Sequence, residues 1–297
     1  MLTSLDHIII GVHDLDAAAQ QFHYNLGLRP SGGGIHPIGG TANRIIVIGD
    51  TYLELIAISQ PEEAQESIRQ RLAQGQGYLN FVLSSNDIEA DSQALRQRGV
   101  AVLGPTPGSL RSADGRTRAW ARVDIERPDL AQHYPFIIQH DSVGDERRQR
   151  LAGWSTPPEH PLGATKVHSV TLAVEDLAEA SQRFAHIYGL QPSEPFSAAS
   201  QGLGAQAVSF PLGQSGQAFE LAAPALEEKG PNALRDHLER FGESLYRMTL
   251  LVDNLAQARR YLTERSVPYT AIEHAHPSLW IDADASCGAP IVLQQVV

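Results

Sequence analysis

The stretch LDHIIIGVHDLDAAAQQF (5–22) places an apolar strand, a short turn with an aspartate and an amphipathic helix in direct succession. The same order recurs three times along the chain. The later copies are YLNFVLSSNDIEADSQAL (78–95), VHSVTLAVEDLAEASQRF (167–184) and LYRMTLLVDNLAQARRYL (245–262). A residue suited to capping a helix N-terminus precedes each helix. These residues are Asp14, Asp87, Asp176 and Asn254. Repetition of one strand–turn–helix unit indicates four duplicated modules.

Strand-like runs follow each helix, so each module has the order βαβββ and the fold class is α+β. The clearest runs are 43–58, 118–125, 135–140, 205–212, 217–224, 279–283 and 290–296. Between the second and third modules the sequence is first charged and then rich in proline, which is typical of a linker. We therefore expect a pair of modules over 1–142, a linker over 143–163 and a second pair over 164–297.

Composition narrows the classes of partner. The 23 basic and 34 acidic residues give a net charge of −11, which disfavours binding to nucleic acid. No apolar run is long enough to cross a bilayer, and the N-terminus lacks the features of a signal peptide. The single cysteine, Cys287, fits a reducing cytoplasm. The expected partners are a small molecule and a second copy of the chain, with no membrane.

Two polar residues interrupt apolar strands of the first module. Side chains alternate along a strand, so His7 shares a face with Ile9, and Glu54 shares one with Tyr52. A carboxylate in such a strand is costly to bury unless it is paired or bound to a cation. The alternative is an edge strand with Glu54 in solvent and His7 merely hydrogen-bonded.

The stretches LDHIIIGVHDLDAA, GGGIHPIGGTANRIIVIGDTYLELIA and RSADGRTRAW resemble the glyoxalase-like branch of the vicinal-oxygen-chelate superfamily. The resemblance continues through PFIIQH and EHPLGATKVHSVTLAVEDL and covers roughly residues 4–180. It implies that paired modules curl into two half-open, barrel-like domains. It also implies metal ligands on the first and fourth strands of a module, where His7 and Glu54 fall. The implied cofactor is a divalent ion: Zn, Ni, Mn, Fe or Co.

The other modules depart from this ligand pattern. Counting seven residues back from the capping residue gives His7, Asn80, Ser169 and Arg247. The expected fourth-strand positions are Glu54, Gln139, Glu220 and Gln294 or Gln295. Only the first module has two strong ligands, and Gln139 would be a weaker third. Because an arginine and a glutamine break the ligand set of the last module, a ring-cleaving dioxygenase is disfavoured, and the second pair is expected to support the first.

A glycine-rich turn, GGGIHPIGGTANR, carries further candidates for ligand binding. The resemblance favours His36, with Thr41 and Asn43, as the rim of the cup, in contact with substrate or metal. Spacing alone leaves open which of the two His36 reaches. The alternative is a histidine in a surface loop.

A run of arginines and a tryptophan forms another candidate surface. Arg118, Trp120 and Arg122 share one face of a strand. They form either a solvated hairpin or a wall of the cup, with Trp120 as a platform. In the second case Arg111 or Arg122 would bind a carboxylate or enolate oxygen of the substrate.

These features favour a metal-dependent enzyme of lyase, isomerase or dioxygenase-like type. It would act on a small anionic substrate that chelates the ion through two oxygens, by way of an enediolate-like intermediate. Glu54 is the expected catalytic residue, and a further carboxylate or histidine would move a proton. The alternative is a protein of the same fold that binds or sequesters an antibiotic or metabolite without turnover.

Overall fold

Each residue expected to cap a helix does so in the computed structural model, which describes residues 1–112, 114–126, 134–154, 156, 158–198, 203–225, 232–273 and 276–296. The capped helices are α1 (Leu15–Gln20), α3 (Ile88–Gln97), α5 (Leu177–Tyr188) and α7 (Leu255–Glu264). In each case the cap side chain accepts a hydrogen bond from a backbone N–H of the first turn. Such caps fix where each helix begins.

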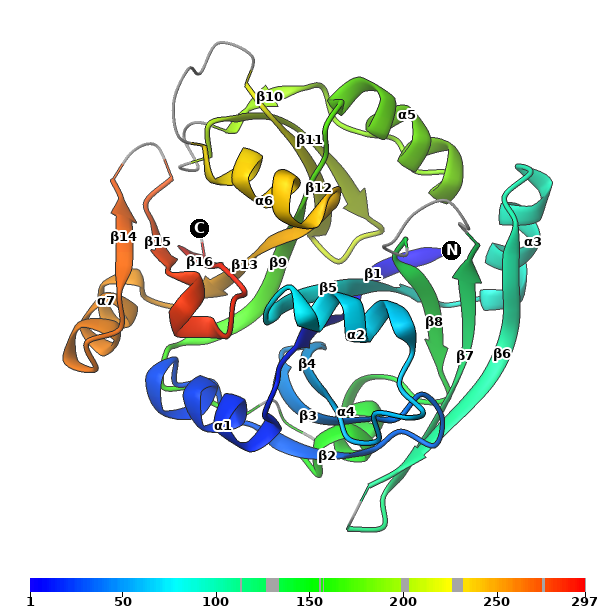
Figure 1. Cartoon of the computed structure of the whole chain (residues 1–297), viewed down its shortest axis with the longest axis horizontal. Helices are drawn as coiled ribbons and strands as arrows, with labels where there is room; N and C mark the ends of the chain where they lie inside the picture. The colour runs from blue at the N-terminus through cyan, green and yellow to red at the C-terminus, as the bar shows by residue number, and fades with distance from the viewer. Residues whose placement is uncertain are drawn as a thin grey trace.

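Two curled eight-stranded sheets confirm the α+β fold of paired βαβββ modules (Figure 1). The first has the order β2-β3-β4-β1-β5-β8-β7-β6 and the second β10-β11-β12-β9-β13-β16-β15-β14. The first sheet comprises β1 (Leu2–Gly11), β2 (Ser31–Ile35), β3 (Thr41–Ile48), β4 (Thr51–Ile58), β5 (Gly77–Ser85), β6 (Val102–Arg111), β7 (Thr117–Ile125) and β8 (Phe136–His140). The second comprises β9 (Ala164–Ala173), β10 (Phe196–Ser197), β11 (Ala205–Leu212), β12 (Gln217–Pro224), β13 (Ser244–Val252), β14 (Tyr269–Ile272), β15 (Ser278–Ile281) and β16 (Ile291–Gln295).

Within each sheet the two modules meet at their first strands. In the N-terminal sheet β1 pairs antiparallel with β5, and each of these strands pairs in parallel with the last strand of its own module. The C-terminal sheet repeats this pattern through β9 and β13. Equivalent positions in the four modules can therefore be identified from strand register.

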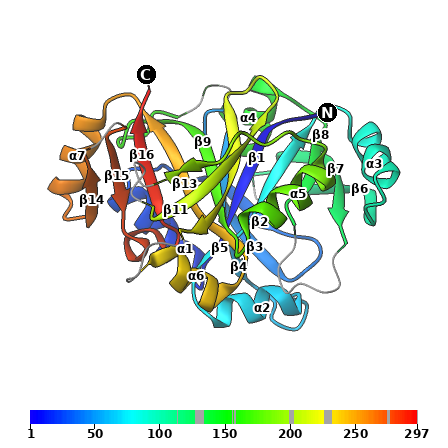
Figure 2. The same ribbon diagram turned by 90° about the horizontal axis from the view of Figure 1, so that it is seen from above.

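The two sheets pack against each other through one apolar core. Phe81 of β5 and Phe219 of β12 have ring centroids 5.7 Å apart, and the core includes residues of both halves of the chain. Helices α2 (Glu66–Ala73) and α6 (Ala233–Phe241) lie side by side in Figures 1 and 2. There the guanidinium of Arg71 lies 4.1 Å from the centroid of the Phe241 ring. None of the described helices is both long and apolar enough to cross a bilayer.

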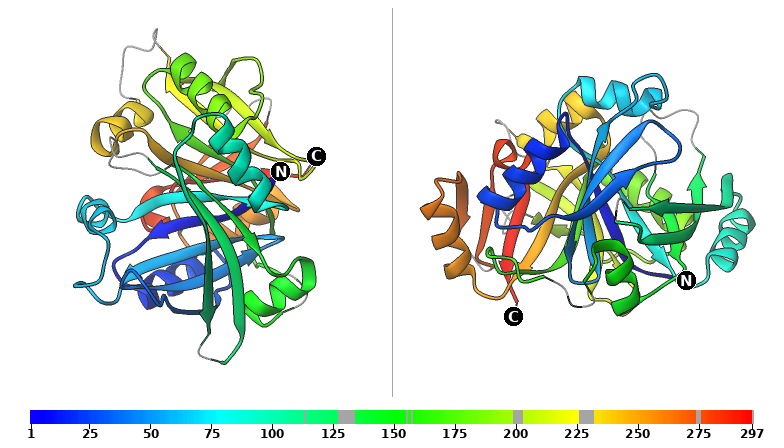
Figure 3. Two further views of the ribbon diagram at one scale, coloured as in Figure 1. Left: turned by 90° about the vertical axis from the view of Figure 1, so that its right-hand side faces the viewer. Right: turned by 90° about the horizontal axis from the view of Figure 1, so that it is seen from below.

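The segment predicted as a linker contains helix α4 (Gly144–Ala152), which contacts β2, β3 and β7. Its buried residues Leu151 and Ala152 form an apolar cluster with Ile45, Val47 and Tyr52. The helix lies against the N-terminal sheet in both views of Figure 3. The prediction from charge and proline content missed this packing, because a nine-residue helix needs only a narrow apolar stripe.

Gln217 of β12 joins the two sheets by hydrogen bonds. Its Nε2 donates to Val167 O at 2.8 Å and to Thr51 Oγ1 at 2.9 Å, and its Oε1 accepts from Leu5 N at 3.1 Å. We expect Gln217→Leu to lower the free energy of unfolding by roughly 2–4 kcal/mol, because buried partners lose their hydrogen bonds. Urea unfolding should show this, whereas Gln214→Leu in the neighbouring exposed turn should change it by less than about 0.5 kcal/mol. Equal losses in the two variants would contradict the prediction.

Candidate functional site

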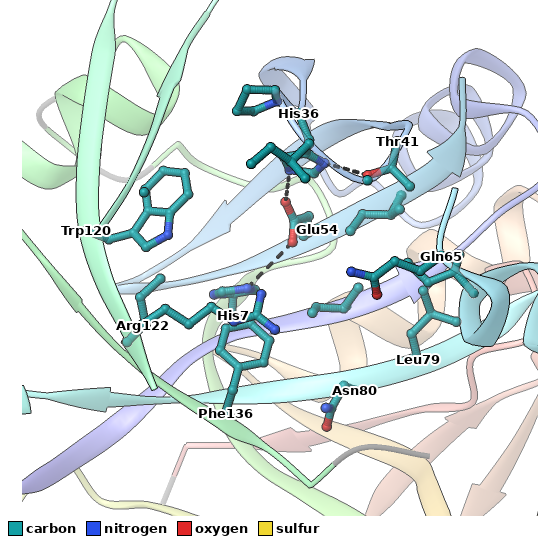
Figure 4. A pocket seen from close by; sticks show the side chains of 18 of the residues that line it. His7, His36, Thr41, Glu54, Gln65, Leu79, Asn80, Trp120, Arg122 and Phe136 are labelled. Atoms are coloured by element: carbon teal, nitrogen blue, oxygen red, sulfur yellow. Dashed lines mark hydrogen bonds and ion pairs between the residues drawn. The ribbon is translucent and has the colours of Figure 1, made fainter. Parts of the chain in front are cut away.

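A cavity of about 350 Å³ lies inside the curl of the N-terminal sheet (Figure 4). Strand alternation places His7 and Ile9 of β1 and Tyr52, Glu54 and Ile56 of β4 on this concave face. Other walls come from the loop after β2, from α2 and from β5, β7 and β8. Their lining residues include His36, Thr41, Gln65, Ile68, Arg71, Leu79, Asn80, Arg118, Trp120, Arg122, Phe136, Ile138 and His140. The volume suits a small organic molecule.

A β-bulge turns Asp6 toward the same side of β1 as His7. Leu5 pairs with Leu83 and His7 with Val82, so Asp6 is the extra residue of the bulge. Asp6 Oδ1 lies 2.7 Å from His7 Nδ1, and both side chains are buried. The imidazole also stacks on Tyr52 with ring centroids 4.6 Å apart. Strict alternation predicts Asp6 on the opposite face, so sequence reasoning missed it.

Asp6 also connects the site to α4 and β8. Arg147 Nη2 lies 2.8 Å from Asp6 Oδ2, and His140 Nε2 lies 3.3 Å from Oδ1. Burial alone raises the pKa of Asp6, but the charge of Arg147 and the charge and hydrogen bond of His140 outweigh it. With the further hydrogen bond from His7, the pKa of Asp6 falls well below its ordinary 3.8. Burial is also the largest influence on His140, and it lowers the pKa of that imidazole.

Glu54 lies between two histidines at the floor of the cavity, as Figure 4 shows. Its Oε2 is 3.5 Å from His7 Nε2, and its Oε1 is 3.4 Å from His36 Nε2. Asn43, which is fully buried, donates to Oε1 at 2.5 Å, and Thr41 Oγ1 holds the other nitrogen of His36 at 2.8 Å. The structure thus brings together the three residues expected at the rim, His36, Thr41 and Asn43, around Glu54.

The electrostatic surroundings keep Glu54 ionised. Burial raises the pKa of Glu54, but the hydrogen bond from His36 and the charges of His7 and His36 lower it more strongly. With the hydrogen bond from Asn43, the pKa of Glu54 moves from 4.5 to about 2. At neutral pH the cavity floor therefore carries a negative charge, which suits it to holding a cation.

Gln139 lies on the opposite face of β8 from the cavity, which corrects its expected position. Its Oε1 accepts from Ile88 N at 2.8 Å, and its Nε2 donates to Asn86 O at 3.3 Å, so its amide is bound to the start of α3. The neighbouring His140 faces the cavity instead. The expected register was three residues out at this strand, because Phe136 and not Gln139 pairs with Val82, and a shift by an odd number of residues moves a side chain to the other face.

Strand register identifies which residue of the second module corresponds to Glu54. In the first module Glu54 pairs with Ile9, and the corresponding pair of the second module is Val82 with Phe136. Phe136, an apolar ring without a ligand atom, therefore occupies the equivalent position. Asn80 corresponds to His7 and lines the cavity, with its Oδ1 accepting from Phe81 N at 2.9 Å.

The face of β7 that carries Arg118, Trp120 and Arg122 lines the cavity. Of the two arginines expected to bind an anion, Arg122 lies on the cavity wall and Arg111 does not. Arg122 forms an ion pair with Asp124, and its Cζ lies 3.6 Å from the centroid of the Phe136 ring. Arg111 is exposed at the end of β6 and is absent from the cavity wall. Arg118 is buried and lines the cavity.

In the third module, the residues at and around the position equivalent to Glu54 form hydrogen bonds and an ion pair with one another. Glu220 pairs in register with Thr171, as Glu54 does with Ile9, and it accepts a hydrogen bond from Thr171 Oγ1 at 2.8 Å. Arg247 donates from Nε to the same hydroxyl at 3.2 Å, and its Nη2 is 3.9 Å from Glu220. In the last module the equivalent residue is Val292, which corrects the expected Gln294 or Gln295.

His7 and Glu54 fit two ligands of a divalent ion. Their facing atoms are 3.5 Å apart, close to the separation of about 3.4 Å between two ligands of a tetrahedral ion. The carboxylate of Asp6 on the far nitrogen of His7 is typical of metal-binding imidazoles. No group of three or more His, Cys, Asp or Glu side chains in the described part of the chain is arranged to hold an ion. Further ligands would therefore come from water or substrate.

Comparison with known proteins identifies the family. Residues 5–188 match the model of the glyoxalase-like domain, and the chain belongs to this family of the vicinal-oxygen-chelate superfamily. No curated protein matches the chain in sequence.

Two solved structures share the fold. One is a hypothetical protein from Staphylococcus aureus, at 15% identity and a TM-score of 0.68, with 99% of this chain and 100% of that chain covered. The other is a variant of 4-hydroxymandelate synthase from Streptomyces coelicolor, at 13% identity and a TM-score of 0.68, with 99% and 92% covered. At these identities the likeness concerns the fold alone.

Proposed function

We propose that the chain is a metal-dependent enzyme of glyoxalase-like type that acts on a small anionic substrate. The observation that carries the proposal is the buried pair of His7 and Glu54 at the floor of the cavity. With only His7 and Glu54 as protein ligands, an ion would have coordination positions left for two adjacent oxygens of a substrate. A divalent ion, when bound, supplies Lewis acidity toward such oxygens.

The protein residues divide the remaining tasks. Asp6 fixes the orientation of the His7 ring through Nδ1, and Asn43 fixes the carboxylate of Glu54. A carboxylate with a pKa of about 2 is a weak base, so the position of Glu54 favours the role of an anionic ligand. We assign movement of a proton to His36 at Nε2, which faces the cavity floor while Thr41 holds Nδ1.

A binding protein without turnover is the second candidate. It is favoured by Phe136 at the position equivalent to Glu54, which removes a ligand, and by the apolar side chains that line much of the cavity. Tight stoichiometric ligand binding in EDTA without product would support this candidate. Product formation that stops on chelation would exclude it.

Metal titration tests the proposal. Protein purified without chelators, stripped with EDTA and titrated with Zn²⁺, Ni²⁺, Mn²⁺, Fe²⁺ or Co²⁺ should bind one ion per chain. His7→Ala should weaken that binding by more than about tenfold, because one of two protein ligands is lost. His13→Ala is the matched control, because His13 lies outside the cavity wall. The proposal fails if no ion binds to the wild type, or if the two variants bind ions equally.

A further inference from the structure

Arg118 is a buried cation that faces the cavity and has no carboxylate partner among the residues that the structure describes. Its side chain lies within the concave face of β7, and the residue is 4% exposed. Within the described residues its guanidinium has no carboxylate within 4.0 Å, and its Nη1 is buried without a hydrogen-bond acceptor. Arg122, on the same face of β7, differs from Arg118 because it forms an ion pair with Asp124.

An unpaired buried guanidinium is costly to the folded protein. Burial removes water from the charge, and proteins normally repay this with a carboxylate or several hydrogen bonds. Another arginine of the site has such a partner, because Arg147 of α4 forms an ion pair with the buried carboxylate of Asp6. Arg118 lacks such a counter-charge, and an anionic ligand in the cavity would supply it.

We infer that Arg118 binds the carboxylate of the substrate and thereby selects small carboxylates with an apolar or aromatic body. This inference rests on the proposed function and specifies its substrate class. The planar guanidinium offers paired N–H donors that match a carboxylate. The other walls contribute Ile9, Ile56, Leu79 and Phe136, which suit an apolar body.

A second buried guanidinium, that of Arg71 on α2, also lines the cavity, but its Nη1 donates to Gly75 O at 2.8 Å and its Cζ lies 4.1 Å from the centroid of the Phe241 ring. Among the described residues Nη1 of Arg118 has no such acceptor, so the guanidinium of Arg118 remains available to a ligand carboxylate.

Binding of neutral and anionic probes tests the inference without metal. In EDTA, wild-type protein should bind benzoate or 3-phenylpropionate more tightly than the corresponding amides, as measured by ligand-observed NMR titration. Arg118→Gln should weaken carboxylate binding by at least about tenfold and change amide binding by less than about threefold. Arg118→Lys should retain part of the preference. Arg44→Gln is the matched control and should change carboxylate binding by less than about threefold, since Arg44 lies outside the cavity wall and pairs with Asp16.

Thermal unfolding separates binding from a structural role. Because Arg118→Gln removes an unpaired buried charge, its unfolding midpoint without ligand should equal or exceed that of the wild type. A lower midpoint together with an equal loss of carboxylate and amide binding would overturn the inference. Absence of any carboxylate preference in the wild type would also overturn it. Failure of metal binding with the preference intact would refute only the proposed metal-dependent function.

Discussion

Asp6→Asn is expected to lower the free energy of unfolding by about 3–5 kcal/mol at pH 7, the usual effect of removing one partner of a buried ion pair. The carboxylate of Asp6 is held by Arg147, His7 and His140, and the residue is 1% exposed. An asparagine leaves the guanidinium of Arg147 without its counter-charge. Urea unfolding in EDTA measures the loss without a contribution from bound metal.

The pH dependence of this loss has a defined sign. Because the pKa of Asp6 is lowered in the folded state, its stabilisation is complete above the ordinary pKa of 3.8 and is lost as pH falls through the folded value. The difference between wild type and Asp6→Asn should therefore be constant near neutrality and shrink below about pH 4. Asp141→Asn is the control, because Asp141 pairs with the partly exposed Arg150 and should cost less than about 1 kcal/mol. A loss of similar size in both variants would contradict the assigned role of Asp6.

Glu54→Gln is expected to weaken divalent-ion binding by more than about 100-fold, which exceeds the 10–100-fold effect of losing a residue that only orients a ligand. The substitution removes the negative charge at the cavity floor and places an amide between His7 and His36. The shift of the Glu54 pKa from 4.5 to about 2 also corresponds to about 3 kcal/mol of folding stability. That stability should be present above pH 4.5 and be lost between pH 4.5 and about 2.

The internal duplication offers a control for Glu54. Glu220 occupies the equivalent register position in the C-terminal sheet but faces Thr171 and Arg247. Glu220→Gln should lower stability and leave ion binding within about threefold of the wild type, because no ligand is removed. Calorimetric titration with Co²⁺ or Zn²⁺ distinguishes the variants. Equal ion binding by Glu54→Gln and the wild type would remove the basis for a metal site.

Strand and helix positions followed from the sequence because local signals and global fold agree in this chain. The four capping residues and the strands 205–212 and 217–224 were predicted with the bounds or positions that the structure has. Alternation also grouped His7 with Ile9 and Glu54 with Tyr52, and all four line the cavity, whereas the pairing of His7 with Glu54 was implied by the family resemblance. These features depend on neighbours in sequence, which a single chain reveals.

The site residues that were missed depend on contacts that no local pattern encodes. Asp6 faces the cavity side only because a bulge interrupts alternation. His140 faces the cavity and Gln139 does not, because the pairing of β8 with β5 places Phe136 opposite Val82, a register that local sequence does not reveal. The role of Arg118 could not be separated from that of Arg122 until the ion pair with Asp124 was known. An aspartate within the apolar run LDHIII was the one available signal for Asp6.

Helix α4 changes where the chain can be divided. It lies in the segment between the two duplicated halves, yet Arg147 reaches back to Asp6 and its apolar side packs on β3 and β4. A gene fragment that ends at residue 142 would separate the N-terminal half from the residue that balances its buried carboxylate. A fragment that includes α4 keeps the charges of that half complete. For recombination or protein engineering, the chain should therefore be divided after α4, because this helix packs with the half that carries the cavity.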